Sequence, residues 1–291
     1  MGRPGGKTLC MALARAAVVL SVFVAVLGVG AVPAAAASQY RFFQFNTAGN
    51  VRYGGDLQAA TDIANSVVAF RPHIATINEI CLNQATALDS QLTARGYPMQ
   101  VRHTQTIPTF VTSKGIGCRY GNALLSVGEG SQPEPAQTVL LPSAGLEQRA
   151  LTCVRVTLPQ SVRACVTHLT NGADADRSTV RDEQVQVVAT SAYVSGTAAV
   201  LGGDMNVSPR GDAFHPDQLD PLYRWLGSGP YLEVEGTRGL CDPVLPPCGP
   251  TLGAVKFDYV FIDRAGWSSP SATTASALVS DHRMLKGYAW R

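Results

Sequence analysis

Short apolar segments that end in a polar or ionisable residue recur along the chain, and they constrain its fold more than any other feature. The clearest junctions are Asn46 after YRFFQF, Glu79 after HIATIN, His168 after VRACVT and Asp204 after AAVLGG. Apolar runs of this length and composition are typical of buried strands. A charged or imidazole side chain beside them is costly unless it faces a cleft or a partner. We therefore expect a sheet protein in which several strand ends converge on one polar site.

Helical and strand-like patterns are both spread over the whole length. Apolar residues at a spacing of three to four predict a helix at 56–70, with Asp56 as N-cap. Further helices are expected at 83–95, 176–194 and 215–228. Strands are expected at 40–46, 73–80, 98–106, 121–127, 149–158, 162–169, 197–204 and 255–263, and around 276–282 and 285–291. Hairpins mixed with β-helix-β steps predict a layered α/β or α+β domain, with strands inside and helices outside.

The N-terminus has the pattern of an export signal rather than of a folded element. A basic lead with Arg3, Lys7 and Arg15 precedes the apolar stretch 17–32, and small residues follow. This is typical of a secretory signal peptide, with cleavage expected after Ala37. The alternative is a retained transmembrane anchor, but the apolar stretch is short for a span of about 20 residues. We expect a signal peptide at 1–37 and a single secreted domain at 38–291.

The charge balance excludes binding to a polyanion by bulk attraction. Loss of the three basic residues in 1–37 changes the formal charge from +2 to −1. Contacts with nucleic acid would therefore have to be local. No feature of the sequence implies a stable protein partner, and we expect a monomer.

Six of the seven cysteines lie beyond the signal segment, an even number that suggests disulfides in an exported chain. Cys153 and Cys165 lie in two strand-like runs around a turn, and Cys241 and Cys248 bracket a proline-rich loop. These placements favour Cys153–Cys165 and Cys241–Cys248, which leaves Cys81 with Cys118. A zinc site is the competing interpretation, although the cysteines and histidines lack the usual ligand spacing.

The residues at the strand ends suit hydrolysis at phosphorus. A hard divalent cation on carboxylate and amide oxygens offsets the charge of a phosphodiester, and the residues that fit this role are Asn46, Glu79, Asp204, Asn206 and Asp281. Imidazoles can transfer a proton or stabilise developing charge near neutral pH, a role that fits His168 and His282.

Seven short motifs in order, QFN, INEI, GNALLS, THL, GGDMN, FDYVF and SDH, together resemble the endonuclease/exonuclease/phosphatase superfamily. Its members include deoxyribonucleases, abasic-site endonucleases, sphingomyelinases and inositol-polyphosphate phosphatases. The resemblance spans roughly 40–285 and implies a four-layer sandwich of two packed mixed β-sheets flanked by helices. The superfamily usually has Gln before the metal-binding Glu, whereas this chain has Asn78, a departure that concerns the residues around Glu79 and not Glu79 itself.

The resemblance also implies roles for individual residues. Glu79 would be the principal ligand of Mg²⁺ or Mn²⁺, with Ca²⁺ as an alternative, and Asn46 and Asp281 would lie close to the metal. Asp204 would orient or deprotonate the attacking water, and Asn206 would hold the phosphate. His282 would pair with Asp258 as a base or phosphate contact, and His168 would stabilise the pentacovalent state.

Two residues beside these motifs are candidates for substrate binding. Asn122 has either a site contact or a β-turn role, and Arg119 is a candidate phosphate contact.

Three functions remain open at this stage. The expected function is a secreted metal-dependent nuclease that hydrolyses phosphodiester bonds, because basic residues lie near the motif loops; they are Arg102, Lys114, Arg119, Arg177, Arg210 and Lys256. The alternative is a sphingomyelinase-like or phospholipase C-like enzyme, for which the segment 221–232 could contact a membrane. The third is a secreted binding protein without activity.

Overall fold

The computed structural model describes residues 37–112, 114–128, 136–158, 160–192, 197–223, 229–235, 248–277 and 279–291. Residues Ala37–Arg291 form one compact unit. Residues 1–36 of the expected signal peptide lie outside the described residues, and so does the apolar stretch of the transmembrane alternative. Within the described ranges, no helix has both the length and the apolar character needed to cross a membrane.

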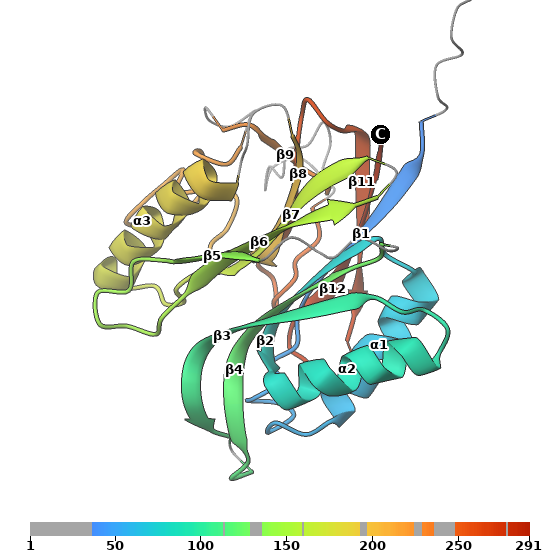
Figure 1. The fold of residues 1–291 in the computed structure, drawn as a ribbon. Helices are drawn as coiled ribbons and strands as arrows, with labels where there is room; N and C mark the ends of the chain where they lie inside the picture. Colours follow the sequence, from blue (N-terminus) through green and yellow to red (C-terminus); the bar gives the residue numbers. More distant parts are fainter. Residues whose placement is uncertain are drawn as a thin grey trace, which may run out of the picture. The chain divides into compact units, whose positions relative to one another are not determined.

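The described strands form two mixed six-stranded sheets (Figure 1). The first sheet has the order β11-β12-β1-β2-β4-β3. Its strands are β1 (Gln39–Asn46), β2 (Ile74–Cys81), β3 (Gln100–Val111), β4 (Gly117–Ser126), β11 (Ser268–Ser276) and β12 (Arg283–Trp290). The second sheet has the order β5-β6-β7-β8-β10-β9. Its strands are β5 (Gln137–Leu140), β6 (Ala150–Thr157), β7 (Ser161–His168), β8 (Ala198–Asp204), β9 (Tyr231–Glu233) and β10 (Asp258–Asp263).

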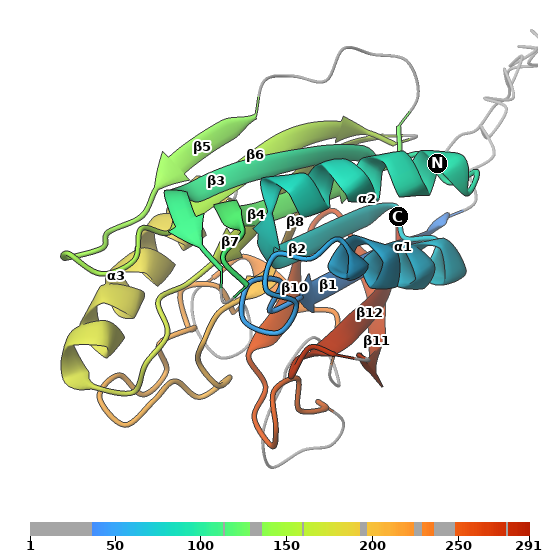
Figure 2. The same cartoon turned by 90° about the horizontal axis from the view of Figure 1, so that it is seen from below.

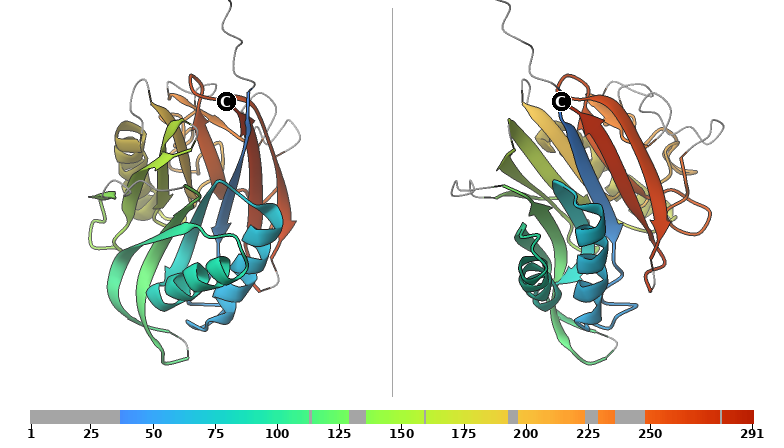
Figure 3. Two further views of the ribbon diagram at one scale, coloured as in Figure 1. Left: turned by 45° about the vertical axis from the view of Figure 1, so that its right-hand side comes forward. Right: turned by 90° about the vertical axis from the view of Figure 1, so that its right-hand side faces the viewer.

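Helices cover the outer face of each sheet. Helices α1 (Gln58–Phe70) and α2 (Leu82–Ala94) lie side by side on the first sheet, and α3 (Ala175–Ala192) lies on the second (Figures 2 and 3). Ile63 and Val67 of α1 pack in one core cluster with Phe43 and Ile77. The predicted four-layer sandwich is confirmed.

A separate core joins the inner faces of the two sheets. Phe42 and Ile74 of the first sheet pack with Val166, Val200 and Val260 of the second. Successive residues of a strand point to opposite faces, so Phe42 lies in this core while its neighbours in the sequence do not. Burial of both faces explains why these strands read as continuous apolar runs.

The glycine pair before Asp204 lets backbones approach closely. A Cβ atom on Gly202 would overlap Thr76 Oγ1 of the opposite sheet and lie 3.0 Å from Thr76 Cβ. A Cβ atom on Gly203 would overlap the Thr167 carbonyl oxygen of the adjacent β7. Gly202 therefore lets the end of β8, which Asp204 closes, approach the first sheet, and Gly203 lets it approach β7.

Two of the expected elements are wrong in part. Residues 215–223 form turns rather than the start of a helix. Tertiary contacts hold them, because the buried Arg181 on α3 donates its Nε–H to Gln218 Oε1 at 2.9 Å and pairs with Asp212. The strand expected around 276–282 is also misplaced, because β11 ends at Ser276. This exposed edge strand consists of small and polar residues and has no apolar alternation to reveal it.

Two disulfides confirm the predicted pairings. Cys81–Cys118 connects β2 with β4, and Cys153–Cys165 connects directly opposed positions of β6 and β7. Cys248 is also disulfide-bonded, but its expected partner at position 241 lies outside the described residues. The zinc interpretation is wrong for the four cysteines of the two described bridges.

Candidate active site

Strand register brings the polar strand ends together. In the first sheet β1 runs parallel to β2, with Asn46 opposite Asn78. In the second sheet β7 runs parallel to β8, with His168 opposite Asp204, and β10 runs antiparallel with Asp258 opposite Asp204. Because the two sheets pack face to face, residues far apart in sequence meet at one edge of the sandwich.

The amide of Asn46 links carboxylates from both sheets. Its Nδ2 donates to Glu79 Oε1 at 3.0 Å and to Asp204 Oδ2 at 2.9 Å. Its Oδ1 accepts the backbone N–H of Ala48 at 3.0 Å. Asn46 and Asp204 are buried, whereas the Glu79 side chain is 20% exposed. Glu79 is therefore the carboxylate of this pair that faces solvent.

Glu79 is held in an unusual backbone conformation. Its φ of 57° lies in the left-handed region, and the pairing of β2 with β4 shifts register between Ile77 and Ile80. The Glu79 carbonyl oxygen accepts the N–H of Gly49 and the hydroxyl of Thr47, both at 3.0 Å. Such conformations are costly for residues other than glycine and persist where surrounding contacts impose them. This register shift is a β-bulge, and it turns the Glu79 side chain away from the direction that regular strand alternation would give it.

Asn78 connects the two sheets beneath the site. Its Oδ1 accepts Gln44 Nε2 at 2.7 Å and the Asp204 N–H at 2.9 Å. Its Nδ2 donates to Asn122 Oδ1 at 2.9 Å and to the Thr167 carbonyl at 2.8 Å. All four hydrogen-bonding positions of the amide are thus used. Asn at this position, where the superfamily usually has Gln, is compatible with a fully bonded network.

His282 and Asp258 form a buried pair. His282 Nδ1 lies 2.8 Å from Asp258 Oδ2, and its Nε2 lies 3.7 Å from Asp204 Oδ2. Burial alone would lower the pKa of His282, but the hydrogen bond and charge of Asp258, with the charges of Asp204 and Asp281, raise it. Burial and the charge of Asp258 also raise the pKa of Asp204. The site thus holds a cationic imidazole beside a carboxyl group with increased proton affinity.

The pKa of His168 is shifted in the opposite direction to that of His282. Its Nδ1 lies 2.9 Å from Arg149 Nη1, and its Nε2 lies 3.0 Å from Asn206 Nδ2. Burial, then the charges of Arg149 and His282, hold the pKa of His168 well below its usual range. One imidazole of the site is therefore neutral and the other is charged.

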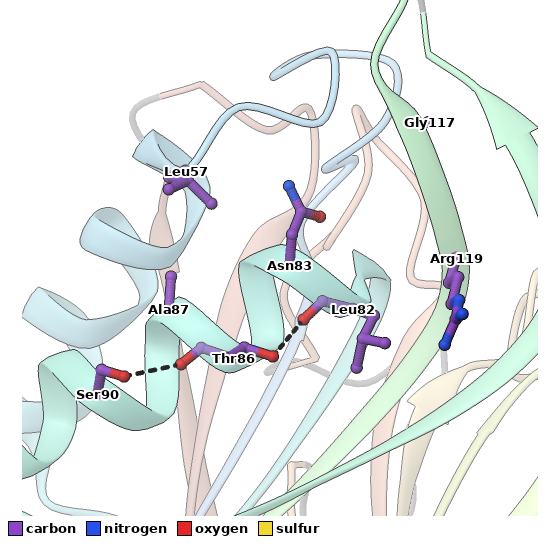
Figure 4. A pocket seen from close by; sticks show the side chains of 8 residues that line it. All are labelled: Leu57, Leu82, Asn83, Thr86, Ala87, Ser90, Gly117 and Arg119. Atoms are coloured by element: carbon purple, nitrogen blue, oxygen red, sulfur yellow. Dashed lines mark hydrogen bonds between the residues drawn. The ribbon is translucent and has the colours of Figure 1, made fainter.

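Three of the sequence candidates lie outside this cluster of direct contacts. Asn122 is buried below it and bonds to Asn78. Asp281 is half-exposed and pairs with Arg52 at 3.1 Å, next to Ser280, whose hydroxyl donates to the Asn46 carbonyl at 2.8 Å. Arg119 lines a separate pocket of about 590 Å³ beside α2, where Figure 4 shows it across from Leu82.

Two residues of the site were missed by sequence reasoning. Arg149, which precedes β6, contacts His168, and Tyr120 of β4 is buried with a hydrogen bond to Glu79. Tyr120 lies two residues before Asn122, so strand alternation could have placed it on the same face. An arginine before a strand carries no comparable signal.

Comparisons with known structures agree with this architecture. An endonuclease/exonuclease/phosphatase from Beutenbergia cavernae superposes with a TM-score of 0.65 at 19% identity, over 86% of this chain and 71% of that one. The human Nocturnin catalytic domain with bound sulfate anion gives a TM-score of 0.65 at 14% identity, over 87% and 95%. Truncated Caenorhabditis elegans TDP2 gives 0.59 at 14% identity, over 87% and 98%. The curated proteins compared with the sequence give no match.

The sequence also matches a model of the endonuclease/exonuclease/phosphatase family over residues 43–282. This match covers most of the chain and includes every residue of the site, from Asn46 to His282. The chain therefore belongs to the endonuclease/exonuclease/phosphatase family.

Proposed function

We propose that the protein is a secreted, divalent-metal-dependent phosphodiesterase that cleaves nucleic acid. The observation that carries this proposal is the meeting of Glu79 and Asp204 at the amide of Asn46, with the Nε2 atoms of two electrostatically different imidazoles each 3.7 Å from Asp204 Oδ2. The N-terminal export pattern and the disulfides support secretion.

The residues fit a hard cation such as Mg²⁺ or Mn²⁺. Glu79 and Asp204 present carboxylate oxygens to the same amide, and the raised pKa of Asp204 reflects excess negative charge that a cation would offset. Asp204, Asp258 and His282 also present ligand atoms within 4.8 Å of one another. Two of these three groups are already hydrogen-bonded to each other, however. We assign the metal to Glu79, the carboxylate that faces solvent, with Asn46 beside it. Asp281, which pairs with Arg52 outside the cluster, is the further candidate ligand.

Each residue of the site has a separate role in the proposed hydrolysis. A bound Mg²⁺ would polarise a phosphoryl oxygen and neutralise its charge. Asp204 accepts the proton of the attacking water, and its raised pKa suits this role. His168 and Asn206 donate to the phosphoryl oxygen as negative charge builds. The charged His282, held by Asp258, adds positive charge beside them, with its Nε2 3.7 Å from Asp204 Oδ2.

The structure narrows the basic residues available for nucleic acid. Lys256 is buried and pairs with Glu233 at 3.0 Å and Glu235 at 2.6 Å, so it contributes no surface charge. Of the other candidates, Lys114, Arg119, Arg177 and Arg210 are exposed and suit contacts with phosphates along a strand, as does the exposed Arg52.

Membrane phospholipid is the weaker substrate candidate. Among the described residues of the segment 221–232, Leu222, Tyr223 and Tyr231 are buried in the core of the second sheet. These residues are therefore not an exposed apolar surface of the kind that interfacial enzymes present to lipid. Residues 224–228 of this segment lie outside the described residues.

A substrate panel with Mg²⁺ tests the proposal. The panel contains plasmid DNA, RNA, sphingomyelin, phosphatidylcholine and inositol phosphates, each with and without EDTA. We expect metal-dependent cleavage of nucleic acid. Turnover of lipid headgroups alone would favour the second candidate, and the absence of turnover on every substrate would favour a binding protein.

A further inference from the structure

Arg149 determines which nitrogen of His168 carries the proton. Arg149 is buried at the start of β6, and its Nη1 lies 2.9 Å from His168 Nδ1. A guanidinium group has only donors and stays protonated in proteins. His168 Nδ1 must therefore accept, and the proton of the neutral imidazole must reside on Nε2.

The other side of the ring faces a second donor. Asn206 Nδ2 lies 3.0 Å from His168 Nε2 and also donates to the Leu169 carbonyl at 3.0 Å. Because a carbonyl oxygen only accepts, it holds the Asn206 amide with its NH₂ group toward His168. Among the described residues, the carboxylate oxygens nearest to Nε2 are Asp204 Oδ2 at 3.7 Å and Glu79 Oε1 at 4.0 Å. Two N–H groups thus converge without a well-placed acceptor between them.

His282 illustrates the effect of a carboxylate, rather than a guanidinium, on Nδ1. There, a carboxylate of Asp258 accepts from Nδ1 and favours the charged ring, in which Nε2 is a charged donor. A guanidinium on Nδ1 has the reverse effect, because it disfavours the charged ring and leaves a single proton, on Nε2. The two imidazoles of the site are therefore oriented by partners of opposite charge and differ in what they can do.

We propose that Arg149 is a positioning residue that fixes His168 as a neutral Nε2–H donor, which forms with the Asn206 amide a two-donor site for one anionic oxygen. The proposed phosphodiesterase function supplies only the identity of that oxygen, a phosphoryl oxygen of the substrate. It follows that His168 is not the general base of the reaction.

The ring nitrogens of His168 test this directly. Two-bond proton–nitrogen correlation spectra of ¹⁵N-histidine-labelled protein distinguish a protonated from an unprotonated ring nitrogen, and a His168→Asn variant assigns the signals. We expect unprotonated Nδ1 and protonated Nε2 in the native protein and in Arg149→Lys, which keeps a donor. In Arg149→Met, Nε2 becomes free to accept from Asn206, so its signal should move toward the unprotonated type. A native protein with the proton on Nδ1, or an Arg149→Met spectrum identical to the native one, overturns the proposal.

Kinetics provide the second readout. Loss of one preorganised donor typically costs about 100-fold in kcat, so Arg149→Met should show this loss with KM changed far less, and Arg149→Lys should recover most of it. Arg163→Met on β7 is the matched control, because this arginine bonds to Gln137 and the Ser191 carbonyl instead of the site. If Arg149→Met does not fold, the spectra of the native protein and of Arg149→Lys still show which ring nitrogen of His168 carries the proton. A protein with the expected tautomer but no phosphodiester turnover would refute the proposed function and leave this inference intact.

Discussion

Replacement of Gly202 by alanine tests how closely the sheets must approach beneath the site. The added Cβ would overlap Thr76 Oγ1 and lie 3.0 Å from Thr76 Cβ, in the buried contact between the sheets. Overpacking of this kind costs about 1–3 kcal/mol. Alanine also lowers the conformational entropy of the unfolded chain, which stabilises the folded state by about 0.4–1 kcal/mol. We expect a net loss near 1 kcal/mol, and hence a fall in Tm of roughly 2–4 °C for a domain of this size.

The same substitution should reduce activity. Asp204 follows Gly202 by two residues, and its N–H donates across the sheets to Asn78 Oδ1 at 2.9 Å. Separation of the sheets would shift Asp204 from Asn46 and Glu79, and a displacement of about 1 Å can cost up to 100-fold in rate. The assays are thermal unfolding by circular dichroism and Mg²⁺-dependent hydrolysis of bis(p-nitrophenyl) phosphate.

Gly117→Ala is the matched control, because a Cβ there meets nothing within 4 Å. Its Tm should stay the same or rise slightly. Thr76→Ala removes the atom that Gly202→Ala would overlap, so the double variant should lose less stability than the two single losses combined, by about 0.5 kcal/mol or more. Equal Tm values for Gly202→Ala and Gly117→Ala would refute the reasoning.

Two further properties follow from the structure. Replacement of both cysteines of a bridge by alanine should lower the free energy of unfolding. The expected loss is about 3 kcal/mol for Cys153–Cys165, whose loop spans 12 residues, and about 4 kcal/mol for Cys81–Cys118, whose loop spans 37 residues. Urea unfolding measures both losses, and a larger loss from the shorter loop would contradict the loop-entropy argument. Burial raises the pKa of Asp212, but bonds from Ser178, His215, Phe214 and Arg181 lower it to about 2. Because this folded-state pKa lies below the unfolded value of about 3.9, the stability that Asp212 contributes is present above about pH 4 and lost as the pH falls toward 2. The stability difference between the native protein and Asp212→Asn should therefore shrink over that interval in urea titrations, and a constant difference would contradict the assignment.

The sequence predicts the architecture because each buried strand carries its own apolar signal. The runs around Phe42, Val166 and Val200 are long enough to identify, and polar residues mark where the site-forming strands end. The edge strand β11 escapes prediction because its side chains are small, polar and exposed. The helix expected from residue 215 fails because contacts with Arg181, which is distant in sequence, override the local pattern.

The candidate site is predictable only where residue type and strand end coincide. Asn46, Glu79, His168 and Asp204 meet that condition. The bulge that turns Glu79 and the placement of Arg149 against His168 depend on pairings between distant strands. These pairings leave no local mark in the sequence, so the orientation of each imidazole becomes visible only in three dimensions.

The hydrolysis rate of the Glu79→Gln variant tests most directly whether Glu79 belongs to a metal-dependent centre, because this substitution keeps the size of the side chain and removes its charge. With bis(p-nitrophenyl) phosphate and Mg²⁺, the account predicts a fall of about 100-fold or more with an unchanged Tm, while Glu183→Gln on the exposed face of α3 keeps the native rate. Native turnover in Glu79→Gln, or full activity of the native protein in EDTA, would contradict a metal-dependent centre at these strand ends.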